Sequence, residues 1–127
     1  MEDARAGTIV REYLTRLLVD HDLSVCEEML AGDYVDHDAP EGTPPGPEAT
    51  RRYAEVMLRD CPDLTVRLHD LVADGHRVAV RAEWLGTDRD TGRRTSTSGL
   101  LVIHLNADGR LRERWSAYGP PQPSAGV

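Results

Sequence analysis

The residues best suited to chemistry form a short cluster, Asp36-His37-Asp38, which follows Tyr34-Val35 and precedes a loop rich in proline and glycine. Alternation along a strand sends Asp36 and Asp38 to one face and His37 to the other, so only one of these sets can face a cavity. A carboxylate in an apolar cavity loses hydration, which raises its pKa and makes it a better proton acceptor near neutral pH. The cluster predicts acid–base catalysis; the alternative is that these residues only cap the nearby loop.

Four further side chains are candidates for the same pocket. Tyr13 falls on the apolar face of a predicted helix, where its phenol can donate a hydrogen bond to a developing oxyanion or can serve for packing alone. His104 interrupts the apolar run 100–105 and is an acid–base partner for Asp38 if it faces the cavity, or a core or interface histidine if it does not. Trp84 and Trp115 either line a pocket or fill the core or a dimer interface.

Three helices are expected before any long strand. Apolar residues recur at helical spacing over residues 3–20, and Ser24-Val25-Cys26-Glu27 has the form of a capping box that begins a short second helix ending at Gly32. A brief strand is expected at 33–38. Pro47 suits the first turn of a third helix, which Cys61-Pro62 ends. The predicted buried stripe of that helix consists of Ala49, Tyr53, Val56 and Met57.

From Asp63 onward the apolar period changes to two. Turn signals at 73–76, 88–92 and 106–109 separate four segments that predict an antiparallel meander. Helices followed by a meander indicate an α+β fold with the helices on one sheet face, and a strongly curved sheet of this kind leaves a cavity against the first helix. Residues 1–118 are expected to form one domain and the Pro-rich residues 119–127 a flexible tail.

Composition excludes several classes of function. The formal charge of −7 argues against nucleic acid, and the absence of lysine excludes Schiff-base chemistry. No apolar stretch approaches the about 20 residues that cross a bilayer, and the start lacks the layout of a secretory signal, so a cytoplasmic protein without a membrane partner is expected. Cys26 and Cys61 fit neither a zinc site nor a disulfide framework. The spacing of His37, Asp38 and His104 matches no metal signature, so no metal is predicted.

Five motifs in order resemble the SnoaL-like polyketide cyclases of the NTF2-like superfamily over about residues 8–118. These motifs are 33–40 (DYVDHDAP), 46–48 (GPE), 62–64 (PDL), 74–81 (DGHRVAVR) and 108–115 (DGRLRERW). The resemblance implies a cone of three N-terminal helices packed on a strongly curved antiparallel sheet, a pocket without a cofactor, and a homodimer.

The resemblance also assigns positions to the candidate residues. In the similar ketosteroid isomerases the general base aligns with Asp38 by helix starts and with His37 by an ungapped count, while Tyr13 falls where they place an oxyanion-hole tyrosine. Among the positions that depart from the relatives' patterns, two bear directly on the chemistry. Gly119 stands where the cyclases carry a catalytic aspartate, and Leu101 stands where the isomerases carry a second oxyanion donor.

The sequence therefore predicts a small enzyme that cyclises an apolar, polyketide-like intermediate of secondary metabolism, such as antibiotic biosynthesis, in a lyase or isomerase type of reaction. Asp38, with His37, would move a proton and Tyr13 would stabilise oxyanion charge; the residues expected to bind substrate are Trp84, Trp115, His104, Met57 and Tyr53. The ring closure would be of the aldol type or, given Gly119, another type such as epoxide opening, oxa-conjugate addition or a pericyclic reaction. The remaining alternatives are an isomerase or dehydratase and a non-catalytic ligand-binding module.

Overall fold

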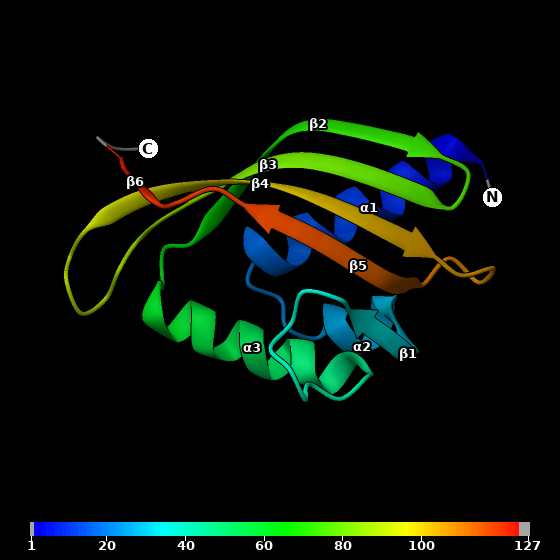
Figure 1. Ribbon diagram of the computed structural model, residues 1–127, viewed down its shortest axis with the longest axis horizontal. Coiled ribbons are helices and arrows are strands. Elements are labelled where there is room, and N and C mark those ends of the chain that lie inside the picture. Colours follow the sequence, from blue (N-terminus) through cyan, green and yellow to red (C-terminus); the bar gives the residue numbers. More distant parts are fainter. Residues whose placement is uncertain (1, 125–127) are drawn as a thin grey trace.

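The computed structural model describes residues 2–124 and confirms the predicted α+β class and cone (Figure 1). Three helices pack against a curved six-stranded sheet. The helices are α1 (Asp3–Leu18), α2 (Val25–Met29) and α3 (Pro47–Asp60). The strands are β1 (Leu30–Asp36), β2 (Thr65–Asp74), β3 (Arg77–Thr87), β4 (Arg94–Leu105), β5 (Leu111–Tyr118) and β6 (Gln122–Pro123).

The sheet has the order β1-β5-β4-β3-β2, with β6 added beside β4. Strands β2 to β5 form the predicted antiparallel meander. Strand β1 pairs in parallel with β5, and this pairing places Asp36 opposite Arg114. The parallel pair brings the Asp36-His37-Asp38 cluster beside a strand that lies more than seventy positions away along the chain.

The two faces of the sheet have different roles. Directly paired residues in an antiparallel ladder point to the same face, so the row Val80–Leu101–Ser116 faces inward and the row Ala79–Val102–Trp115 faces outward. Helix α1 lies against the inner face (Figure 1). The buried core includes, from α1, Val10, Tyr13, Leu14 and Leu17 and, from the strands, Val78, Val80, Leu101 and Ile103.

Helix α3 is packed more loosely than its sequence predicts. Of the stripe expected to be buried, Tyr53 is 65% exposed and Val56 is 45% exposed, and Ala54 is the residue of α3 that is fully buried. The reason is that α3 contacts α2 and the edge strand β1 but stands away from strands β2 to β5, with a cavity between. Of the predicted stripe, Ala49, Tyr53 and Met57 therefore line the cavity, and Val56 does not.

Two local predictions before β1 are wrong. Gly32 does not end α2 but lies inside β1, which starts earlier than expected. The capping box is not formed, because Ser24 has a helical backbone (φ −63°, ψ −19°) and its hydroxyl donates to Asp22 Oδ1 at 2.5 Å. A side-chain N-cap needs an extended backbone at the cap residue.

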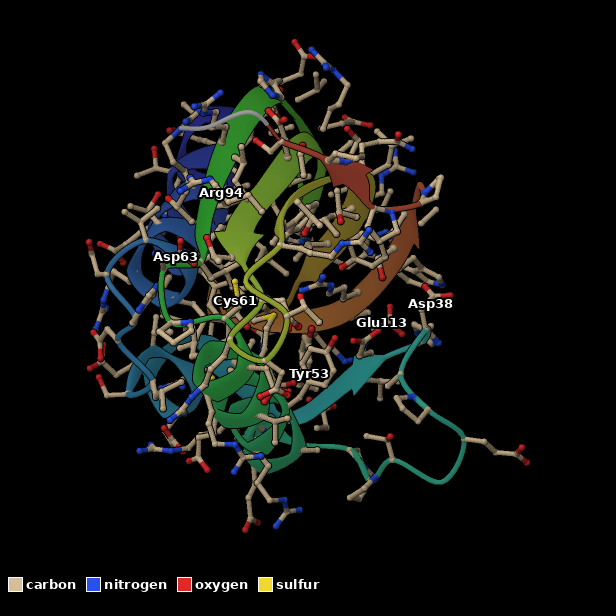
Figure 2. The ribbon with its side chains drawn as sticks, turned by 90° about the vertical axis from the view of Figure 1, so that its left-hand side faces the viewer. Asp38, Tyr53, Cys61, Asp63, Arg94 and Glu113 are labelled. Carbon is tan, nitrogen blue, oxygen red and sulfur yellow. The ribbon has the colours of Figure 1, made fainter. Side chains whose placement is uncertain are left out.

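Two further contacts tie connecting segments to the ends of the long strands β3 and β4. Asp63 accepts hydrogen bonds from the amide and hydroxyl of Thr87, and so ties the α3–β2 connection to the end of β3; Figure 2 labels Asp63 beside Cys61. The tail predicted to be flexible carries β6, whose Gln122 and Pro123 pair with Ser96 and Thr95 of β4. Residues 125–127 of that tail lie outside the described residues.

Candidate active site

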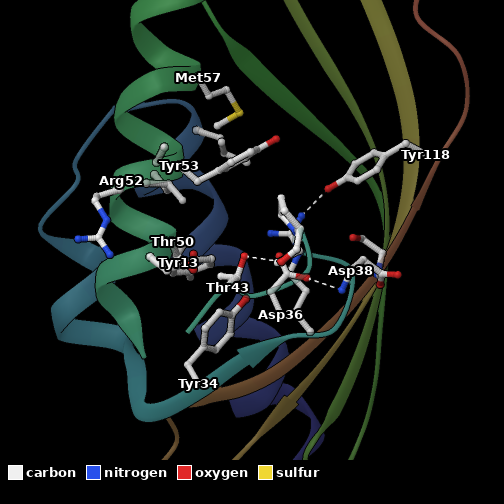
Figure 3. Close-up of a pocket in the computed structure, with 18 of the residues that line it drawn as sticks. Tyr13, Tyr34, Asp36, Asp38, Thr43, Thr50, Arg52, Tyr53, Met57 and Tyr118 are labelled. Atoms are coloured by element: carbon white, nitrogen blue, oxygen red, sulfur yellow. Dashed lines mark hydrogen bonds between the residues drawn. The ribbon is translucent and has the colours of Figure 1, made fainter. Parts of the chain in front are cut away.

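A cavity of about 770 Å³ lies between α1, α3, the β1–α3 loop and the inner sheet face (Figure 3). This volume is within the range of small-molecule sites. Much of its wall is apolar, formed by Leu17, Leu18, Ala54, Met57, Leu64 and Trp84. Polar side chains reach it from β1, the following loop and β5, and these residues give the cavity its chemistry.

Two carboxylates occupy one wall. Asp36 and Asp38 line the cavity and His37 does not, as alternation along the strand requires. Asp38 Oδ2 accepts the Ser116 amide proton at 2.7 Å, and Asp36 Oδ1 accepts the Asp38 amide proton at 3.0 Å. The second oxygen of each carboxylate has no hydrogen bond to any residue of 2–124, so both can meet a ligand. Asp36 is half-buried and Asp38 is exposed at the mouth.

Three phenols and the Asp36 carboxylate lie around a cation, Arg114. Arg114 faces the cavity from β5, and its guanidinium donates to the Tyr118 hydroxyl. Burial acts to lower the pKa of Arg114, but the surrounding phenols and the Asp36 carboxylate outweigh it, so the pKa is raised and the guanidinium stays charged. Burial also raises the pKa values of Tyr13 and Tyr34, and both phenols therefore remain protonated donors.

Gly99 makes room for two aromatic rings of the cavity wall. Trp84 and Tyr118 meet edge to face with their ring centroids 5.1 Å apart. A Cβ atom at Gly99 would lie 2.6 Å from Tyr118 Cδ1 and 2.9 Å from Trp84 Cζ3, closer than side chains pack. The absence of a side chain at Gly99 thus leaves room for the Tyr118 ring, whose hydroxyl accepts the hydrogen bond from Arg114.

The structure brings five of the predicted site residues to this cavity: Tyr13, Asp38, Tyr53, Met57 and Trp84. Tyr13 is fully buried, Tyr53 and Met57 project from α3, and Trp84 lies on β3.

His37, His104 and Trp115 were expected in the pocket but lie on the outer sheet face. The His37 and Trp115 rings stack with centroids 4.4 Å apart and planes 10° apart, and the tilted His104 ring lies 4.7 Å from that of Trp115. Glu113 stands between the two histidines, 3.6 Å from a ring nitrogen of each. These four residues, His37, His104, Glu113 and Trp115, form what we call the outer cluster. No member lines the cavity.

His37 and His104 face outward by simple alternation along their strands, whereas the outward position of Trp115 has another cause, a bulge in β5. Leu111 pairs with Leu105 and Glu113 pairs with His104, so β5 advances two residues where β4 advances one. An extra residue inverts the alternation beyond it. Arg114 therefore turns inward and Trp115 outward, although simple alternation from the buried Leu111 predicts the opposite.

Sequence reasoning missed Arg114, Tyr34 and Tyr118 as cavity residues and favoured Asp38 over Asp36. For Asp36 the signal was present, because it shares a strand face with Asp38. For Arg114 no local signal existed, because the bulge that turns it inward is set by pairing with β4.

The described residues show neither a metal-binding cluster nor a membrane-spanning helix. Across residues 2–124, no group of three or more His, Cys, Asp or Glu side chains is placed to hold a metal ion. None of the helices in this range combines the length and the apolar character that a membrane span requires.

Comparison with known proteins decides the family. The SnoaL-like domain family matches residues 10–114, most of the chain. This chain is a SnoaL-like protein. Its fold is of the SnoaL-like polyketide-cyclase type, as the resemblance implied. No functionally curated protein matches the sequence.

Three solved structures illustrate the family likeness. IdmH from Streptomyces antibioticus, a candidate polyketide cyclase, is 26% identical with a TM-score of 0.77, covering 89% of this chain and 91% of its own. TsrD from Streptomyces laurentii is 19% identical with a TM-score of 0.82, covering 93% and 90%. SalBIII, an epoxide hydrolase/cyclase-like enzyme with a role in pyran ring formation in the polyether salinomycin, is 21% identical with a TM-score of 0.78, covering 91% and 92%. At these last two identities the likeness is one of fold.

Proposed function

We propose that this SnoaL-like protein is a cofactor-free cyclase that acts by acid–base chemistry on an apolar, polyketide-like intermediate. The observation that carries the proposal is the pair Asp36 and Asp38 in the wall of a largely apolar cavity large enough for such a molecule. A carboxylate with an open oxygen beside an apolar substrate can remove a proton from a carbon next to a carbonyl. The apolar walls hold the flexible chain with its reacting atoms close together.

Within the pair, we assign the base to Asp36. It is the more buried carboxylate and pairs in register with Arg114. A substrate oxygen near Tyr13 or Arg114 therefore places its neighbouring carbon toward Asp36. Asp38 lies at the mouth, where the Ser116 amide holds it, and we assign it to orienting substrate and the loop. This revises the expectation that Asp38 is the principal base.

The proposed reaction needs only the substrate and the Asp36 carboxylate, which first accepts a proton and then returns it. Asp36 takes a proton from the carbon next to a carbonyl, and the electrons of that C–H bond move to the carbonyl oxygen as an enolate. The enolate carbon forms a C–C bond to a second carbonyl of the same molecule, which becomes an alkoxide. The protonated Asp36 returns its proton to that alkoxide. This sequence needs no acid at position 119, and Gly119 follows the end of β5 outside the cavity lining.

The test separates catalysis from binding without knowledge of the natural substrate. The probe is 2-tetralone, an apolar bicyclic ketone, whose exchange of protons for deuterium next to the carbonyl is followed by NMR. We expect the wild type to accelerate exchange and Asp36→Asn to lose about 100-fold of that acceleration. Asp20→Asn, on the surface away from the cavity, is the matched control and should exchange like the wild type.

Two results would contradict the proposal. Equal exchange by Asp36→Asn and the wild type, with both folded by circular dichroism, would remove Asp36 as the base. Binding of 2-tetralone by the wild type without any acceleration would favour the non-catalytic binding module.

We also propose that two copies pair through the outer sheet face. Leu100 and Val102 are exposed there at 58% and 38%, next to Trp115 of the outer cluster. Exposed apolar side chains gathered on one sheet face are typical of protein interfaces. A second copy offers the same apolar surface, as a two-fold dimer requires.

A further inference from the structure

Two buried donors in the cavity have no partner. In the described part of the chain, the buried side-chain nitrogen and oxygen atoms without a hydrogen bond are Tyr13 hydroxyl and Arg114 Nε. Both residues line the same cavity, although one comes from α1 and the other from β5. Buried donors are nearly always paired in folded proteins, because an unpaired one costs stability. Their occurrence in one cavity indicates that a ligand supplies the missing acceptor.

The second observation concerns charge. Arg114 keeps its positive charge, yet none of the ion pairs among residues 2–124 includes it. Asp36 is its neighbour in register, but no nitrogen–oxygen pair of the two lies within 4.0 Å. The partner of its Nη2 is the neutral hydroxyl of Tyr118. A half-buried guanidinium that forms no ion pair within 4.0 Å favours an anionic ligand oxygen beside it.

The position of Arg114 is fixed by its surroundings. The β5 bulge turns the side chain inward, and the Tyr118 hydroxyl holds one end of the guanidinium. Gly99 in turn leaves the space that the Tyr118 ring occupies. A guanidinium held in this way is preorganised, which is the condition for selective recognition of an oxyanion.

We propose that Arg114 and Tyr13 form an anion subsite, and that the ligand is an apolar molecule with one acidic oxygen, such as a phenol or the enol of a 1,3-dicarbonyl, bound as its anion. Arg114 determines the preference for the anion and Tyr13 adds one hydrogen bond. This deepens the proposed function and rests on it in taking this cavity as the substrate pocket. A polyketide-like intermediate with alternating carbonyl groups contains such an acidic oxygen.

The test uses 2-naphthol, whose neutral and anionic forms differ in absorbance and fluorescence. We expect the wild-type cavity to bind naphtholate more tightly than naphthol, so that the pKa of the bound probe falls by about one unit, a tenfold preference. Arg114→Met should abolish the preference while 2-tetralone, which is neutral, still binds. Tyr13→Phe should weaken naphtholate binding and keep part of the preference.

The control is Arg59→Met, which removes the same charge from the exposed surface of α3 and should leave the preference intact. An unshifted probe pKa in the wild type, or an unchanged preference in folded Arg114→Met, overturns the proposal. If Arg114→Met does not fold, addition of naphtholate and of 2-tetralone to the wild type at several pH values still decides whether the anion is preferred.

The two proposals fail in different ways. Asp36→Asn should lose proton exchange but bind naphtholate at least as tightly as the wild type, because a negative charge has left the cavity. Anion preference without proton exchange would leave the subsite standing and contradict the enzyme. Proton exchange without a preference for the anion would support the proposed enzyme and contradict the anion subsite.

Discussion

Asp36 and Arg114 lie opposite each other in the parallel pair of β1 and β5, both line the cavity, and yet they form no ion pair within 4.0 Å. A carboxylate and a guanidinium that neutralised each other would offer a ligand neither a base nor an anion-binding donor. Their separation leaves both functions available in one cavity. The chemistry proposed for this protein depends on that arrangement.

Alternation along β1 predicts different effects for neighbouring substitutions. His37→Ala should leave 2-tetralone exchange within about twofold of the wild type, because His37 stacks on Trp115 outside the cavity. Asp38→Asn should reduce exchange by about tenfold, less than Asp36→Asn, since Asp38 lies at the mouth. The 2-tetralone exchange rates of the three variants are measured by NMR. A larger loss from His37→Ala than from Asp36→Asn would contradict the assignment of the inner face.

Gly99→Ala should damage the cavity wall. The added methyl would meet Tyr118 and Trp84 at under 3 Å, so the rings must move, at a cost of about 1–3 kcal/mol in the free energy of unfolding. Denaturant unfolding measures that cost, and naphtholate binding reports the displaced Tyr118. The matched control is Gly32→Ala, in a strand position where no atom lies within 4 Å of the new Cβ. Equal stability of the two variants would show that the wall tolerates the methyl.

Asp63 should contribute stability that depends on pH. The hydrogen bond from the Thr87 amide holds the pKa of this carboxyl below its usual value, and the Thr87 hydroxyl adds to the effect. A lowered folded-state pKa means stability that is present above the unfolded-state pKa and lost as the pH falls through the folded one. Asp63→Asn should therefore lower the thermal midpoint at about pH 7 and have less effect at about pH 3.

The control for this prediction is Asp20→Asn, an exposed carboxyl without a hydrogen bond to another residue of 2–124. Circular dichroism melting curves of the three proteins at both pH values provide the comparison. A loss in Asp63→Asn that is the same at both pH values would mean that the carboxylate charge contributes nothing.

Leu100→Glu should separate the proposed dimer. Leu100 is 58% exposed on the outer face beside the outer cluster, and a charge there would be desolvated in a two-fold interface. Sedimentation should find a wild-type dimer and a Leu100→Glu monomer with unchanged circular dichroism. Val19→Glu, at the exposed end of α1, should remain a dimer. A monomeric wild type would contradict the dimer without affecting the cavity proposals.

The amino-acid sequence by itself determined the elements and the fold class. The helical spacing over residues 3–20, the proline at 47 and the turns between apolar alternations predict helices and strands close to those observed. It also determined that Asp36 and Asp38 share a face and that His37 does not, because the two-residue period of a strand is a local property.

The tertiary structure alone decided which residues meet in the cavity. The parallel pairing of β1 with β5 joins residues far apart in the chain, and the β5 bulge exchanges the faces of Arg114 and Trp115. Pairing register and bulges depend on the neighbouring strand, so a pattern read along one strand cannot contain them. For that reason Trp115 was expected inside, and the arginine that gives the cavity its charge was found only in the structure.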